Sequence, residues 1–160
     1  MKVSIIMGSD SDLPTMKDTA KTLEEFGIQY EIKILSAHRT PEQLKEYIKQ
    51  AEETGTEVFI AAAGGAAHLA GVVASYTTLP VIGVPMDSPL MGLDSILSML
   101  QMPPGIPVGV MSKGLWGAKN AAIFAVQILS LKYPELKEKL QQYKQKMVSN
   151  VLEKNKDIVL

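Results

Sequence analysis

Short apolar runs alternate with longer segments of helical periodicity along this chain of 160 residues. The apolar runs are nearly continuous and rich in aliphatic and β-branched residues, which is typical of strands buried on both faces of a sheet. Because helical segments separate these runs, we predict an α/β fold, in which a parallel sheet carries helices on both faces. The predicted strands cover residues 3–7, 30–35, 57–63, 80–84 and 107–111.

The segments between the apolar runs predict helices, and particular residues mark their ends. Gly27 and Gly55 stand where helix C-caps belong. The sequence Thr40-Pro41-Glu42-Gln43 predicts a capping box, in which Thr40 caps the helix and Gln43 reaches back to it. The predicted helices between strands cover residues 13–26, 41–54, 66–76 and 93–100.

The last part of the chain predicts two further helices. Residues 116–131 are rich in alanine and apolar nearly all round, so we expect burial in the core or in a subunit interface, with Trp116 as a packing or interface residue. Residues 134–153 are charged and keep apolar residues at helical spacing. We expect this helix to pack on the domain or on a neighbouring subunit. No linker or repeat divides the chain, so we predict a single domain over residues 1–160.

Charge and composition exclude several classes of protein. The net charge is −1 with interleaved signs, which does not predict a surface for nucleic acid or for an anionic membrane. The absence of cysteine excludes disulfides, thiolate catalysis and zinc–thiolate sites. The longest apolar stretch, residues 58–75, is interrupted by glycines and a histidine and does not predict a membrane span. The chain starts directly with a strand pattern rather than a signal peptide, so we expect a cytoplasmic protein.

Polar and glycine residues follow each predicted strand. Ligands of an open parallel sheet bind beyond the carboxyl ends of its strands, so we expect a site at this edge. Both histidines of the chain, His38 and His68, fall in these segments. The segments are Gly8-Ser9-Asp10-Ser11-Asp12, Ser36-Ala37-His38-Arg39-Thr40, Gly64-Gly65-Ala66-Ala67-His68, Met86-Asp87-Ser88-Pro89 and Ser112-Lys113-Gly114.

The residue types in these segments fit a nucleotide monophosphate. The hydroxyls of Ser9 and Ser11, together with helix N-terminal amides and Arg39, can hold a phosphate. A neighbouring carboxylate can accept hydrogen bonds from ribose hydroxyls, and a histidine can transfer protons near neutral pH. Each segment taken alone also fits a structural role, as a turn, a cap or a close strand–helix approach. Their meeting at one edge favours a site.

Other sites of this architecture fit less well. The first strand is not followed by G-x-G-x-x-G, and the chain contains neither a P-loop nor histidines and carboxylates at metal-ligand spacing. A phosphorylated receiver domain would have an acidic pair after the first strand and a lysine after the fifth. Asp10 and Asp12 match the acidic pair, and Lys113 matches the lysine. The phosphate acceptor of such a domain would be an aspartate at the end of the third strand, where this chain has Ala63-Gly64.

Four ordered motifs resemble the N5-carboxyaminoimidazole ribonucleotide mutase family, the class I catalytic subunits of phosphoribosylaminoimidazole carboxylase in purine (IMP) biosynthesis. The resemblance covers nearly the whole chain. It implies a flavodoxin-like three-layer αβα sandwich with a five-stranded parallel sheet, a homo-octamer and functional coupling to the ATP-dependent synthetase that makes the substrate. It also implies no metal, no nucleotide cofactor and no covalent intermediate. The motifs are Gly8-Ser9-x-Ser11-Asp12, Ser36-Ala37-His38-Arg39-Thr40-Pro41, Gly64-Gly65-Ala66-Ala67-His68-Leu69 and Gln101-Met102-Pro103-x-Gly105-Ile106-Pro107-Val108.

The resemblance also implies roles for individual residues. His38 matches the catalytic acid–base group, and His68 matches a second active-site histidine. Asp12 would bind the ribose hydroxyls, whereas Asp10 lies at a variable position and is expected to be a solvated loop residue. Residues 101–103 resemble a loop that closes the site. The implied substrate-binding residues are Ser9, Ser11, Asp12, Ser36, Ala37, Arg39, Ala63, Gly64, Gly65 and Leu69.

The family has two branches, which differ in the motif that follows the third strand. The sequence from Gly64 to Leu69 resembles the mutase branch, which isomerises N5-carboxyaminoimidazole ribonucleotide to 4-carboxy-5-aminoimidazole ribonucleotide. The branch that carboxylates aminoimidazole ribonucleotide directly with CO2 lacks the histidine at His68 and remains an alternative. A non-catalytic nucleotide-binding module is a second alternative. The chain departs from the family pattern at Ala62, at Ala70 and in residues 111–116.

Overall fold

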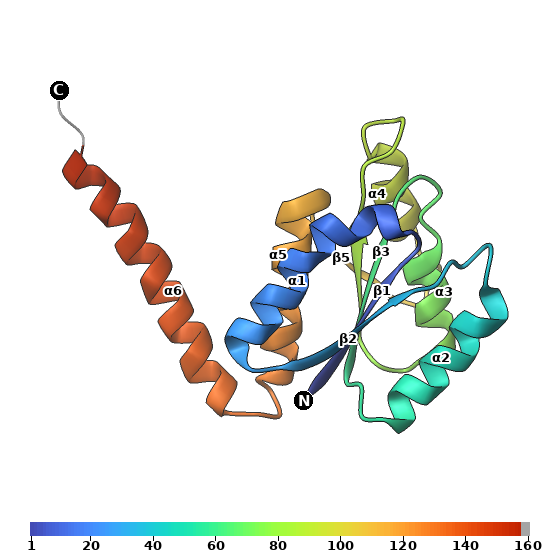
Figure 1. Cartoon of the computed structure of the whole chain (residues 1–160), viewed down its shortest axis with the longest axis horizontal. Coiled ribbons are helices and arrows are strands. Elements are labelled where there is room, and N and C mark those ends of the chain that lie inside the picture. Colours follow the sequence, from blue (N-terminus) through green and yellow to red (C-terminus); the bar gives the residue numbers. More distant parts are fainter. Residues whose placement is uncertain (158–160) are drawn as a thin grey trace.

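The computed structural model, which describes residues 1–157, contains one five-stranded parallel sheet (Figure 1). The strands are β1 (Lys2–Met7), β2 (Gln29–Ile34), β3 (Val58–Ala63), β4 (Val81–Pro85) and β5 (Gly109–Val110). They lie in the order β2-β1-β3-β4-β5, and every neighbouring pair is parallel. This order is the flavodoxin-like one, so the predicted fold is confirmed.

Helices cover both faces of the sheet and complete three layers. One face packs against α1 (Leu13–Phe26) and α5 (Gly114–Leu129), which also contact each other. The other face packs against α2 (Pro41–Glu53) and α3 (Leu69–Tyr76), together with Met99 of α4 (Leu93–Leu100). Successive strand residues point to opposite faces: Ile5 lies in the first core and Ile6 in the second.

The last long helix, α6 (Glu135–Lys154), extends away from the body of the molecule (Figure 1). Its first half packs on the domain through the buried Leu136 and through Tyr143, whose ring centroid lies 5.6 Å from that of Phe26. All residues from 144 to 156 are exposed. None of the helices within residues 1–157 combines the length and the apolar character that a membrane crossing requires.

Four local expectations are corrected by the structure. β2 is not buried on both faces, because it pairs only with β1 at the sheet edge and leaves Ile34 51% exposed. β5 is two residues long rather than five, and α3 begins at Leu69 rather than at residue 66. The capping box is absent: the Thr40 hydroxyl accepts a hydrogen bond from the Ser36 amide (2.9 Å) instead of capping α2.

The alanine-rich helix α5 is buried on one side only. Small residues such as Ala118, Ala121 and Ala125 lie against α1 and the sheet. The opposite side is exposed on this chain: Trp116 is 81% exposed and Leu115 is 57% exposed. The chain itself therefore does not provide the all-round burial that the composition of this helix predicts.

Candidate active site

A cavity of about 510 Å³ opens at the carboxyl edge of the sheet, where the loops after β1, β2, β3 and β4 meet. Every predicted site residue except Gly65 lines this cavity. The lining residues are Gly8, Ser9, Ser11, Asp12, Ser36, Ala37, His38, Arg39, Ala63, Gly64, Ala66, His68, Leu69 and Asp87. Side chains from four separate segments of the sequence therefore form one pocket.

The two histidines contact each other directly in this pocket. His38 Nε2 lies 2.8 Å from His68 Nδ1, and the two rings meet edge to face with an interplanar angle of 81°. Both side chains are exposed to the cavity. A bond between two ring nitrogens holds one hydrogen, so one ring donates it and the other accepts it. The pair can therefore hold a proton and transfer it to a bound molecule.

The loop after β2 is built around the hydroxyl of Ser36. This oxygen accepts hydrogen bonds from the His38 amide (3.3 Å) and from the Arg39 amide (3.2 Å). Thr40 closes the same loop, because its amide donates to the Ser36 carbonyl (3.0 Å) and its hydroxyl also donates there (3.1 Å). These bonds fix a tight turn that directs His38 and Arg39 toward the cavity.

Arg39 links the loop after β2 to the loop after β1. Its Nη2 donates to the Gly8 carbonyl (2.9 Å), and its Nε donates to the Ser36 hydroxyl (3.4 Å). A guanidinium has five N–H donors, so these two bonds leave donors free for an anion. No carboxylate forms an ion pair with Arg39 within the described part of the chain. Its positive charge is therefore available to the cavity.

The loop after β1 contributes hydroxyls and a carboxylate. The Ser9 hydroxyl accepts from the Ser11 amide (3.3 Å) and caps a short 3-10 helix, Asp10–Asp12, that leads into α1. Burial raises the pKa of Asp12, and nearby Asp10 adds to this rise, while a hydrogen bond from Ser11 lowers it. Asp10 itself is exposed and does not line the cavity, in agreement with the role expected for it.

The loop after β3 brings His68 into place. Gly64 touches the next loop so closely that a Cβ there would lie 2.7 Å from the Asp87 carbonyl oxygen. Gly65 has a φ of +65°, a left-handed conformation that favours glycine. α4 supports this loop from outside, because the Ser98 hydroxyl accepts from the Ala67 amide (3.2 Å). Gly65 therefore shapes the loop, although it does not line the cavity.

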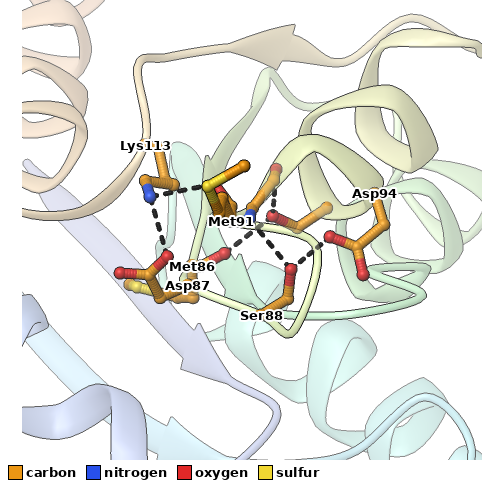
Figure 2. Close-up of polar contacts among 8 residues, drawn as sticks. Met86, Asp87, Ser88, Met91, Asp94 and Lys113 are labelled. Atoms are coloured by element: carbon orange, nitrogen blue, oxygen red, sulfur yellow. Dashed lines mark hydrogen bonds and ion pairs between the residues drawn. The ribbon is translucent and has the colours of Figure 1, made fainter.

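Three lining residues were not among the predicted site residues: Gly8, Ala66 and Asp87. Gly8 and Ala66 lie inside two of the family motifs, and Asp87 lies in the segment that follows the fourth strand. Their position directly after strands is the signal by which they could be found. The segment after β5 does not reach the cavity itself. Lys113 contacts the lining residue Asp87 instead, with 2.7 Å between Nζ and Oδ1 (Figure 2).

Residues of the expected closing loop lie beside the cavity rather than in it. Gln101 and Met102 line a neighbouring hollow that shares Ala66 and His68 with the site.

Within residues 1–157, no three histidine, aspartate or glutamate side chains gather as metal ligands. The cavity thus offers hydroxyls and a guanidinium for an anion, a carboxylate for hydroxyl groups and a histidine pair for proton transfer.

Comparisons with known proteins identify the family of this chain. A model of the AIR carboxylase family matches residues 2–150. An N5-carboxyaminoimidazole ribonucleotide mutase of Pyrococcus abyssi is 64% identical over 91% of this chain and 83% of its own length. A mutase of the same name from Thermotoga maritima is 60% identical over 96% of this chain and 89% of its own length.

The backbone of this chain also resembles that of a solved structure. The crystal structure of Treponema denticola PurE superimposes with a TM-score of 0.90 at 31% identity and covers 99% of both chains. The match therefore extends over the sheet, both helical layers and the final helix. By family model, by sequence and by backbone, the chain belongs to the AIR carboxylase family.

Proposed function

We propose that this chain converts N5-carboxyaminoimidazole ribonucleotide to 4-carboxy-5-aminoimidazole ribonucleotide in purine (IMP) biosynthesis. The contact between His38 and His68 carries this proposal, because it places a proton-transfer pair inside a cavity equipped for a nucleotide. Relatives at 64% and 60% identity bear the name of this mutase, which supports the same reaction here.

The cavity walls suit the two ends of the substrate. The hydroxyls of Ser9 and Ser36 and the free donors of Arg39 would hold the phosphate. Asp12 would accept hydrogen bonds from the ribose hydroxyls, with Ser11 beside it. The rest of the pocket wall and the turn that shapes it would surround the imidazole ring and the carboxyl group: Ala37, Ala63, Gly64, Gly65 and Leu69.

The first step breaks the bond between the carboxyl carbon and N5. Protonated His38 donates its proton to the carbamate nitrogen, and the electrons of the breaking N–C bond stay on that nitrogen. The products are aminoimidazole ribonucleotide and CO2, both held in the cavity, while His38 becomes neutral. Its contact with His68 orients the ring for this transfer.

The second step forms the new bond to carbon. C4 of the electron-rich imidazole ring attacks the trapped CO2, and neutral His38 then takes the proton from C4 and restores aromaticity. His38 ends in the protonated state in which it began, so the two steps balance without another reactant. The apolar wall from Ala63 to Leu69 would limit water while CO2 is held. We propose that residues 101–103 close the site during these steps.

The experiment is to offer purified protein each nucleotide separately and follow formation of the carboxylated product. Conversion of the N5-carboxylated nucleotide, with slow reaction of aminoimidazole ribonucleotide except at high bicarbonate, is the expected result. Preference for aminoimidazole ribonucleotide and CO2 would instead assign the direct carboxylase reaction. Binding of the nucleotide without either reaction would assign a non-catalytic module.

We also propose that the enzyme acts as a homo-octamer in the cytoplasm, next to the ATP-dependent synthetase that forms its substrate. Large apolar side chains exposed on this chain support self-association. They gather on the segment around α4, on the start of α5 and on the second half of α6. They include Leu90, Met91, Leu93, Leu97, Leu115, Trp116, Met147, Val148, Val151 and Leu152.

A further inference from the structure

One carboxylate in the cavity wall is paired with a cation from outside it. Asp87 follows β4 and lines the cavity, and its side chain is 80% exposed. Lys113, the residue that precedes α5, places its ammonium group 2.7 Å from Asp87 Oδ1 (Figure 2). Lys113 itself does not line the cavity, so it contacts the cavity wall only through the loop after β4 that carries Asp87.

The same lysine is held along the whole length of its side chain. Its Nζ also donates to the Met91 carbonyl (3.0 Å), as Figure 2 shows. Its alkyl chain passes so close to Gly92 that a Cβ there would lie 2.2 Å from Lys113 Cδ. Gly92 has a φ of +81°, so glycine suits both its backbone and this contact. The ammonium group therefore has a defined position.

The loop that carries Asp87 is itself fixed. The Ser95 hydroxyl donates to the Met86 carbonyl (2.7 Å), the Gly92 amide donates to the Ser88 hydroxyl (3.0 Å), and Ser88 also bonds Asp94. These bonds hold residues 86–92 independently of Lys113, whose bond to the Met91 carbonyl adds to them. The distinct contribution of Lys113 is its charge, because it supplies the one cation in contact with Asp87 among residues 1–157.

The charges of the wall show why this pairing matters. At neutral pH the lining carries two carboxylates, those of Asp12 and Asp87, and one permanent cation, the guanidinium of Arg39. The pKa of Asp87 is lowered by its hydrogen bond and charge interaction with Lys113, so this carboxylate stays ionised. An unpaired Asp87 would repel a phosphate in the same cavity, whereas the ion pair of Asp87 with Lys113 carries no net charge.

We propose that Lys113 is a positioning residue. It holds the Asp87 carboxylate at the side of the cavity nearest the start of α5 and cancels the negative charge of that carboxylate, so that the cavity accepts an anionic nucleotide. The anionic ligand class rests on the proposed function. Lys113 acts through Asp87 and does not touch the reacting atoms. Its removal should therefore change binding more than the chemical step.

The test compares wild type with Lys113→Met, Asp87→Asn and the double variant. Methionine keeps a stem that can lie against Gly92 but loses the charge. We expect Lys113→Met to raise KM for the N5-carboxylated nucleotide and Kd for ribose 5-phosphate on the order of fivefold, with kcat within about twofold. We expect Asp87→Asn to bind ribose 5-phosphate at least as tightly as wild type, and the double variant to restore wild-type affinity.

Ionic strength separates this role from a purely structural one. The loss in Lys113→Met should shrink between low salt and physiological salt, because screening weakens exposed charges. The proposal is overturned if the double variant binds ribose 5-phosphate as weakly as Lys113→Met does, or if Lys113→Met leaves the Kd unchanged.

If Lys113→Met does not fold, the Kd of Asp87→Asn for ribose 5-phosphate provides the test. Weakened binding overturns the proposal, and equal or tighter binding supports it. Wild-type protein that turns over neither nucleotide would refute the proposed function, while the ribose 5-phosphate comparison would still decide the role of Lys113.

Discussion

His38 Nε2 lies within hydrogen-bond distance of His68 Nδ1, at 2.8 Å, although the two residues are 30 positions apart in the sequence. They come from loops after β2 and β3, two strands that do not neighbour each other in the sheet because β1 lies between them. The bond therefore joins the two sides of the cavity above β1. The proton transfer that we propose for this cavity would therefore depend on both loops.

Replacing His38 removes the proposed acid–base group. We expect His38→Asn to lower kcat by about a thousandfold, within the usual range for general acid–base catalysis, with KM changed much less. Steady-state kinetics with the N5-carboxylated nucleotide measure both constants. Asp10→Asn is a matched control, because Asp10 is exposed in a neighbouring loop and outside the cavity. Retention of most activity in His38→Asn would contradict the assigned steps.

Replacing His68 should cost less than replacing His38. His68→Asn removes the ring that contacts His38 Nε2 but leaves the acid–base group, so we expect kcat to fall roughly ten- to a hundredfold. The double variant should lose little more than His38→Asn alone, because the two rings act as a pair. Additive losses in the double variant would show that His68 acts independently of His38.

The proposed role of Asp12 in substrate binding predicts that binding depends on pH. Burial raises the pKa of this carboxyl, so its protonation on acidification begins above the ordinary range of aspartate. We expect the KM of the wild type to rise as pH falls through that range. Asp12→Asn should raise KM about tenfold at neutral pH, and its KM should no longer rise on acidification.

The raised pKa of Asp12 also predicts an effect on stability, because a carboxyl whose pKa is raised in the folded state disfavours folding when it ionises. The thermal midpoint of Asp12→Asn should therefore exceed that of wild type at neutral pH and equal it at strongly acidic pH.

Glu57 should control stability rather than activity. Burial raises the pKa of Glu57, but hydrogen bonds from Lys132 and Tyr133 and the nearby N-terminal amine outweigh burial and lower it overall. The stability gained from a lowered carboxyl pKa is present above the unfolded pKa and is lost as pH falls through the folded value. We expect Glu57→Gln to lower the free energy of unfolding by about 1–2 kcal/mol at pH 7, and by less as the pH becomes acidic. Urea titrations at several pH values measure this.

The fold was predictable because its main signals are local. A buried parallel strand such as β3 is apolar at every position, and each helix between strands shows its own periodicity and end residues. The partial exposure of β2 does have a signal in its residues, because polar Gln29, Glu31 and Lys33 alternate with apolar residues, as in a half-buried strand. The position of β2 at the sheet edge, paired with β1 alone, is a property of the topology that this strand by itself does not encode.

The candidate site was predictable in its location but not in its contacts. Topology brings the ends of parallel strands to one edge, which is why most of the predicted residues line one cavity. The contact of Asp87 with Lys113 joins loops 26 residues apart and depends on side-chain conformations that have no sequence pattern. Thr40 shows the same limit: a local rule assigns it to α2, whereas its hydroxyl accepts from the Ser36 amide.

The second half of α6 provides the test of self-association. Beyond Tyr143 this helix is exposed, yet Met147 and Val151 continue the apolar spacing of Leu136, Leu140 and Tyr143, which pack on the domain. A negative charge on this stripe should break contacts between chains and leave the chain's own fold intact. We expect Val151→Glu to shift the molar mass measured by light scattering from that of the proposed octamer to smaller species, with an unchanged circular dichroism spectrum. Ser149→Glu is the matched control, because two residues of an α-helix turn about 200° and place Ser149 away from Met147. An unchanged molar mass in Val151→Glu would show that α6 does not hold the assembly together.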